Sequence, residues 1–187
     1  RNLEQQFLLS CEGRLYSGMP FTELRRMQLD IETACSEEGG FSDPNHPDDR
    51  IIAIGLKLGQ DIEAISLDSF SDDSEKTLLK CLNERIAEWD PDVIEGHNIF
   101  KFDLNYLRTR AKHLKAPISW GRFGQSATFR KSRLRVAERW IDYPRCDLPG
   151  RAVVDTFLLT QVYDATAREL MSYGLKDVAR FLGITPE

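Results

Sequence analysis

Residues 28–33 constrain this chain more than any other stretch. Apolar Leu29 and Ile31 alternate with polar residues, which is the period of a β-strand. Alternate residues of a strand share a face about 6–7 Å apart, so Asp30 and Glu32 present two carboxylates side by side. Two carboxylates aimed at one point repel each other unless a cation lies between them, and their hard oxygen ligands suit Mg²⁺ or Mn²⁺. The pair therefore indicates a divalent-metal site, although a surface strand with two solvated acids has the same pattern.

A second acidic position follows about seventy residues later. Asp103 stands where the short apolar strand that begins at Val93 gives way to a helix through Leu104 and Leu107. A carboxylate at such a junction can point out of the strand end, where open α/β sheets place their sites. The alternative is an ordinary acid in the first turn of a helix.

Length and composition fit one globular domain, because the 187 residues are 41% hydrophobic and 29% charged. No stretch approaches the ~20 apolar residues that span a bilayer, and no signal peptide opens the sequence. The cysteines form no C-x-x-C pair and the histidines have no ligand spacing; they are Cys11, Cys35, Cys81, Cys146, His46, His97 and His113. This usage predicts reduced thiols in an intracellular, cytoplasmic protein without a membrane partner.

Charge is distributed unevenly along the chain. Residues 108–151 hold 12 Lys and Arg against 3 Asp and Glu, whereas the remainder holds 13 basic and 27 acidic residues. Aromatic residues lie between these cations, at Trp120, Phe123, Phe129, Trp140 and Tyr143. Such a segment can stack bases and neutralise phosphates, or it can be a hairpin whose aromatics pack inward and whose arginines are solvated.

Hydrophobic periodicity predicts an α/β fold. Strands are expected at 27–33, 51–58, 62–67, 93–94 and 151–155, with a turn at 59–61. Helices are expected over 71–89, from Leu104 past Ala111, from Phe157, and from a cap at Ser172 to Gly183. Strands first, followed by alternating strands and helices, indicate a mixed sheet flanked by helices.

Four groups of residues together match a known pattern. They are Asp30-Ile31-Glu32-Thr33, Asn98 through Phe102-Asp103 with Asp90-Pro91-Asp92-Val93-Ile94 before it, Gly150-Arg151 ahead of Asp155, and Ser172-Tyr173-Gly174-Leu175 running to Phe181-Leu182-Gly183. This set resembles the 3′–5′ exonuclease domain of family-B DNA polymerases, an RNase H-like fold of the DEDD exonuclease superfamily. The resemblance covers residues 27–187 and leaves 1–26 as an N-terminal approach segment.

The resemblance implies an α/β, RNase H-like mixed sheet whose first three strands are antiparallel. It also implies two divalent metal ions, Mg²⁺ or Mn²⁺, held by four acids. Three acids map directly: Asp30 would bridge both ions, Glu32 would hold the ion on the side of the attacking water, and Asp103 would hold the other. Thr33, Asn98 and Phe102 map to the substrate groove, and Asp155 to an acid near the site that is not a usual metal ligand.

The fourth acid has two candidate positions. In the family it lies in a Tyr-x-x-x-Asp motif on the last helix, and Tyr173 to Asp177 has that spacing. However, residues 178–183 resemble the family's preceding helix, which places the motif beyond Glu187. We expect the second placement, in which the domain over 27–187 lacks its C-terminal helix.

The resemblance implies hydrolysis at the 3′ end of single-stranded DNA, of the proofreading type, with a polymerase domain as a possible partner. Two other interpretations stay open. One is a nucleic-acid-binding module of the same fold with weak or no catalysis. The other is a ribonuclease, because nothing in the sequence addresses recognition of a 2′-hydroxyl.

Overall fold

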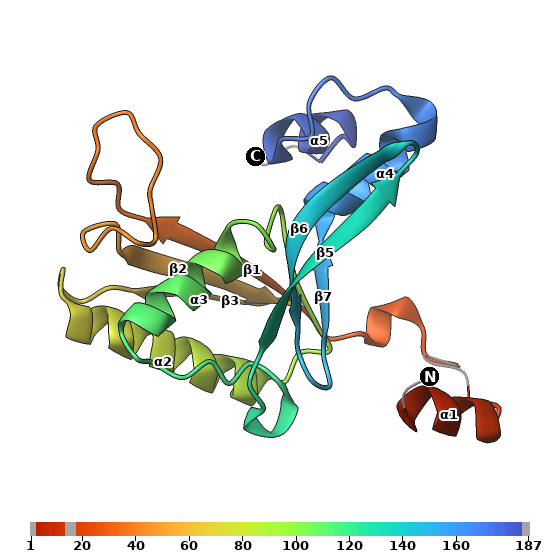
Figure 1. Cartoon of the computed structure of the whole chain (residues 1–187), viewed down its shortest axis with the longest axis horizontal. Helices are drawn as coiled ribbons and strands as arrows, with labels where there is room; N and C mark the ends of the chain where they lie inside the picture. Colours follow the sequence, from red (N-terminus) through yellow and green to blue (C-terminus); the bar gives the residue numbers. More distant parts are fainter. Residues whose placement is uncertain (1–2, 14–17, 185–187) are drawn as a thin grey trace.

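The computed structural model describes residues 3–13 and 18–184, which form a mixed α/β structure (Figure 1). The helices are α1 (Leu3–Ser10), α2 (Asp72–Trp89), α3 (Asp103–His113), α4 (Thr156–Ala167) and α5 (Leu175–Phe181), with short 3₁₀ turns at Phe21–Glu23 and Arg122–Gly124. The strands are β1 (Arg26–Thr33), β2 (Ile51–Leu58), β3 (Asp61–Ser66), β4 (Val93–Gly96), β5 (Thr128–Val136), β6 (Arg139–Asp147) and β7 (Ala152–Asp155). Within the described residues, no helix combines the length and the apolar character needed to cross a membrane.

Five strands form one sheet in the order β3-β2-β1-β4-β7. β1 pairs with β2 and β2 with β3 in antiparallel fashion, whereas β1 with β4 and β4 with β7 are parallel. The predicted mixed sheet with an antiparallel first half is therefore confirmed. β5 and β6 form a separate antiparallel hairpin that extends alongside α4 in Figure 1.

The hydrophobic core lies on one face of the sheet. The buried residues of β1 are Met27, Leu29 and Ile31, in strict alternation with exposed Gln28, Asp30 and Glu32. Leu82 of α2 and Leu107 of α3 belong to the same buried cluster. Helices α2 and α3 therefore cover this face, and the other face of β1 carries the polar side chains.

Two local features differ from the sequence prediction. The last helix begins at Leu175 with Gly174 at the N-cap position, because the Ser172 hydroxyl accepts a hydrogen bond from Gly174 N before the helix starts. Helix α1 is absent from the sequence prediction, since its short apolar run carries no clear helical period.

The basic segment has features of both structures that its sequence allows: some of its aromatic side chains pack inward, and others are exposed. Trp120, just before it, is buried (2% exposed), whereas Trp140 on β6 is 57% exposed and Phe123 is 99% exposed. Some aromatic side chains of this segment therefore pack inward, and others remain available to a ligand.

A buried ion pair fixes the loop between β1 and β2. Arg110 Nη2 of α3 lies 2.6 Å from Glu75 Oε2 of α2, and both side chains are almost fully buried. Glu75 Oε1 also accepts a hydrogen bond from Ile51 N, and Arg110 donates to the carbonyl of His46 in the loop. Tyr106 of α3 donates to the carbonyl of Asp49, so the loop is held at several points.

Removing one member of this pair should cost more than removing both. We expect Glu75→Leu to destabilise the protein by about 3–5 kcal/mol, because it leaves the Arg110 charge buried without a partner. Adding Arg110→Met should recover part of that loss. Urea unfolding of the single and double variants measures this coupling.

The exposed pair Lys80–Glu84 on α2 is the control, and Lys80→Met should have little effect on unfolding. Purely additive losses for Glu75→Leu and Arg110→Met would contradict the interpretation.

Candidate active site

Asp30 and Glu32 lie on the exposed face of β1, opposite the core. Their alternation with Leu29 and Ile31 places both carboxylates on the same side, as the sequence predicts. Asp30 lines a hollow of about 470 Å³. The other walls come from β1, β2, β3, β4 with the residue after it, and the first residues of α4 and α5. The residues are Gln28, Leu29, Gly55, Leu56, Lys57, Ile62, Glu63, Ala64, Glu95, Gly96, His97, Thr156 and Leu175.

Asp103 reaches β1 from the start of α3. It is the first residue of that helix and is 2% exposed, and its Oδ1 accepts a hydrogen bond of 3.1 Å from Ile31 N, between Asp30 and Glu32 in the strand. The pKa of this carboxyl is raised to about 7, mainly by burial and also by the negative charges of Asp30 and Asp155, against opposing hydrogen bonds from backbone N–H groups. The second acidic motif is therefore joined to the first one.

The predicted substrate-binding residues lie around this junction. Asn98 follows β4 in the left-handed region with φ of +64°, and its carbonyl accepts hydrogen bonds from Lys101 N and Phe102 N. Phe102 is 38% exposed, and its ring centroid lies 5.5 Å from that of Tyr106. Thr33, at the end of β1, exchanges a hydrogen bond of 2.8 Å with Ser42 in the following loop. The turn therefore groups Asn98, Phe102 and Asp103, while Thr33, the last residue of β1, is hydrogen-bonded to the loop between β1 and β2.

The types of side chain at this site suit a divalent ion, but their positions do not form a complete metal site among the described residues. Asp30, Glu32 and Asp103 offer hard carboxylate oxygens, and Asp30 acts electrostatically on Asp103. Nevertheless, within residues 3–13 and 18–184, no group of three or more His, Cys, Asp or Glu side chains is gathered closely enough to hold a metal ion. The donor set therefore suits a divalent ion, whereas the side-chain positions in the described part of the chain do not form a complete site.

The described candidates for the fourth acid are engaged elsewhere. Asp177 is exposed on α5 and pairs with Arg180 at 3.1 Å. The Tyr173 hydroxyl donates to Asp164 Oδ2 at 2.9 Å. Both polar groups therefore have local partners on the α4–α5 side of the molecule.

His97 is a structural link that the sequence does not suggest. Its Nε2 donates to the carbonyl of Tyr173 at 2.8 Å, and its Nδ1 lies 3.0 Å from Thr156 Oγ1. It joins the end of β4 to the segment between α4 and α5, in the wall of the hollow that contains Asp30. The one feature of the sequence that could have pointed to His97 is its position directly after a short buried strand.

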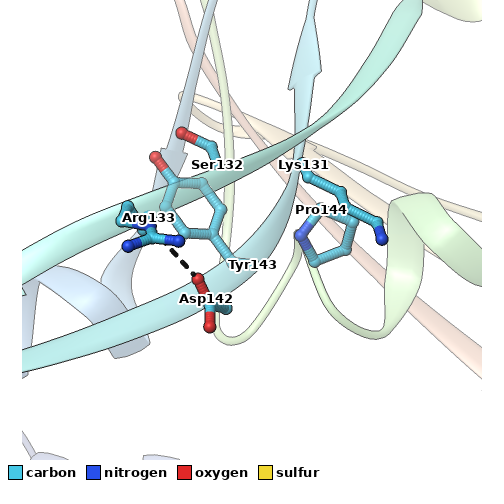
Figure 2. Close-up of a pocket in the computed structure, with 6 residues that line it drawn as sticks. All are labelled: Lys131, Ser132, Arg133, Asp142, Tyr143 and Pro144. Atoms are coloured by element: carbon cyan, nitrogen blue, oxygen red, sulfur yellow. Dashed lines mark ion pairs between the residues drawn. The ribbon is translucent and has the colours of Figure 1, made fainter.

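The hairpin presents a second polar surface (Figure 2). Lys131 and Arg133 of β5 face Pro144 and Asp142 of β6 in a hollow of about 640 Å³ that Tyr143 of β6 also lines. Arg133 Nε lies 3.6 Å from Asp142, drawn as a dashed line in Figure 2. Part of the basic charge of this segment is thus already paired within the hairpin.

Comparison with known proteins assigns the chain to a family. Residues 6–178 match the family described as DNA polymerase family B, exonuclease domain. The chain belongs to this family. Membership of it implies a nuclease that in general depends on divalent metal ions.

Similar proteins agree with this assignment. A DNA polymerase of Archaeoglobus fulgidus is 31% identical over 167 residues, which are 88% of this chain and 18% of that protein. The DNA polymerase delta catalytic subunit of Oryza sativa is 32% identical over 145 residues, covering 69% of this chain and 12% of the relative. The structure of the family B DNA polymerase from Pyrobaculum calidifontis superposes with a TM-score of 0.66 at 27% identity, over 87% of this chain and 18% of that one. The chain therefore spans less than a fifth of the length of these relatives.

The buried carboxyl of this exonuclease domain should make its stability depend on pH. Because the pKa of Asp103 is raised from 3.8 to about 7, the fold prefers the protonated form, and this contribution is lost as the pH rises through about 7. In metal-free buffer, Asp103→Asn should therefore stabilise the protein at pH 8, by at most about 4 kcal/mol, and less at pH 5. Urea unfolding at both pH values measures this difference.

Asp177→Asn is the control, since Asp177 is an exposed acid. A stabilisation by Asp103→Asn that is the same at pH 5 and pH 8, or a loss of stability at pH 8, would contradict the assigned burial cost.

Proposed function

We propose that the chain is a metal-dependent 3′–5′ exonuclease that hydrolyses the terminal phosphodiester of single-stranded DNA and releases a nucleoside 5′-monophosphate, as a proofreading domain beside a polymerase domain. The observation that carries this proposal is the hydrogen bond from Ile31 N to Asp103 Oδ1. It joins the two acidic motifs, which lie 72 residues apart in the sequence.

Each acid has a distinct part in this proposal. Asp30 and Glu32 would offer solvent-accessible carboxylates from the exposed face of β1. Asp103 would add a third, buried carboxylate from the start of α3. Bound divalent ions would activate water, bind the scissile phosphate and stabilise the leaving 3′-oxygen. Asp103 would give up its carboxyl proton when cations are present, because a neighbouring positive charge favours the ionised form.

The 3′ end would lie against the turn that precedes α3. The exposed ring of Phe102 offers a face on which a terminal base can stack, and Asn98 lies at the start of the same turn. Thr33 would contribute from the end of β1. Stacking tolerates every base, so this arrangement suits a nuclease without sequence preference.

Replacing Asp30 should abolish most of the activity. On a labelled single strand with Mg²⁺ or Mn²⁺, we expect Asp30→Ala to lower the rate on the order of 10²–10³-fold, since metal-ion catalysis supplies several kcal/mol. Asp61→Ala, which removes an exposed acid at the start of β3, is the matched control and should cleave like the parent. Equal rates for Asp30→Ala and the parent would refute the assignment.

A second function is favoured by the dispersed acids. Because no three-acid group is gathered among the described residues, the chain could bind nucleic acid without cleaving it. Calorimetric titration with Mn²⁺ separates the two possibilities. Two-site binding that Glu32→Gln abolishes supports the enzyme, whereas intact DNA binding without any Mn²⁺ binding supports the module. Parallel assays on RNA strands test the ribonuclease alternative.

The hairpin should bind phosphates without sequence preference. Lys131, Arg133 and Arg135 lie on alternate residues of β5, on one exposed side of the hairpin. Lys131→Gln with Arg135→Gln should flatten the slope of log K against log salt by about 0.7 for each phosphate that is no longer neutralised on a single strand. Binding titrations over a range of salt concentrations give this slope.

Lys76→Gln with Lys80→Gln removes two exposed cations from α2 and is the control. An unchanged slope for the hairpin variant would mean that these cations are merely solvated. Arg130 is a weaker test because its guanidinium already pairs with Asp147 at 2.6 Å.

A further inference from the structure

Asp155 is a buried acid with an unusual number of backbone partners. It is the last residue of β7 and is 4% exposed. Its carboxylate accepts hydrogen bonds from four backbone N–H groups, those of Asn98 (3.0 Å), Phe100 (3.2 Å), Phe157 (2.9 Å) and Leu158 (3.4 Å). Two of these groups begin α4 and two belong to the turn that leads into α3.

The two carboxylate oxygens have different tasks. Oδ1 caps α4 through Phe157 N and Leu158 N and also accepts from Asn98 N. Oδ2 accepts a hydrogen bond from Phe100 N. Phe100 is not part of α4, so this hydrogen bond is not part of the helix cap. Capping α4 would need one oxygen, so the second oxygen serves the turn.

The turn contains a residue in an uncommon backbone conformation. Asn98 has a φ of +64°, in the left-handed region that Asn adopts more readily than most L-residues. The next hydrogen bonds, from Lys101 N and Phe102 N to the Asn98 carbonyl, place Asp103 at the start of α3. The chain of hydrogen bonds therefore runs from Asp155 through the turn to Asp103 and on to Ile31 N.

We propose that Asp155 is a positioning residue: its two oxygens fix the turn at 98–102 so that Asp103 meets β1 beside Asp30 and Glu32. The inference rests on the proposed nuclease function for its catalytic consequence. Asp155 itself touches neither the substrate nor a metal ion in this scheme. It acts through the geometry of Asp103, where a displacement of about 1 Å can cost 10²-fold in rate.

Asp155→Asn is the direct test because it keeps the size of the side chain. An amide has one acceptor oxygen, and its NH₂ group would face an N–H donor that now has no acceptor. Asp155→Ser is a second variant, because a serine can still cap α4 but cannot reach Phe100. It keeps the test valid if the asparagine variant does not fold.

Asp164→Asn provides a matched control on the neighbouring helix. Asp164 is 3% exposed and accepts hydrogen bonds from Glu169 N, Leu170 N and the Tyr173 hydroxyl. It therefore resembles Asp155 in burial and in its hydrogen bonds to backbone N–H groups. Its two backbone partners, however, lie just beyond the other end of α4.

The first readout does not depend on activity. Amide hydrogen exchange followed by NMR in metal-free protein should accelerate at Asn98, Phe100 and Ile31 in both Asp155 variants, on the order of tenfold. The Ile31 amide reports on Asp103, because it donates to that carboxyl. Asp164→Asn should leave these three amides unchanged. An unchanged Ile31 amide in the Asp155 variants would overturn the proposal.

The second readout is the rate of cleavage. The Asp155 variants should lower kcat by about 10–100-fold. Asp164→Asn should retain the kcat of the parent. If the Asp155 variants cleave as Asp164→Asn does, the catalytic part of the proposal is wrong. If the parent itself does not cleave while Ile31 exchange still accelerates, the proposed function fails and the positioning role stands.

Discussion

The hydrogen bond from Ile31 N to Asp103 Oδ1 is the interaction on which the candidate site depends. It attaches the start of α3 to the middle of β1, so that three acids from two distant segments share one region of the sheet. The strand alternation that buries Ile31 also exposes Asp30 and Glu32 on the opposite face. Ile31 therefore has two roles: its side chain packs in the core, and its backbone N–H binds Asp103 beside Asp30 and Glu32.

Two buried acids, Asp49 and Asp103, show opposite shifts in pKa. Asp49 accepts hydrogen bonds from Asp43 N and Ser36 N, and these hydrogen bonds hold the pKa of its carboxyl below its usual value. Asp103 has a raised pKa instead, because burial outweighs its hydrogen bonds and the charge of Asp30 lies nearby. Asp49 is therefore stable as an anion within the fold, whereas Asp103 needs either a proton or a cation. This difference is consistent with the metal-binding role that we propose for Asp103.

Much of the fold can be predicted from the sequence because its strands have a clear period. The alternation in β1 and the β-branched start of β2 indicate those strands and the antiparallel half of the sheet. The predicted start of α5 is wrong, because a serine close to a helix suggests a cap, whereas in the folded chain its hydroxyl serves Gly174 N. The four-way hydrogen bonding of Asp155 cannot be foreseen, since it depends on the parallel pairing of β4 with β7 and on the unusual φ of Asn98. The positions of Asp30, Glu32 and Asp103 follow from motif and resemblance, and their role in metal binding stays a prediction.

A crystal of the protein soaked with Mn²⁺ and measured for anomalous scattering tests the central claim most directly. We expect anomalous peaks between the carboxylates of Asp30, Glu32 and Asp103, with the three acids drawn together around them. Metal–oxygen distances should be close to the ~2.0–2.1 Å that a small hard cation such as Mg²⁺ requires. Peaks confined to other acids, or no peak in a crystal that binds single-stranded DNA, would contradict it.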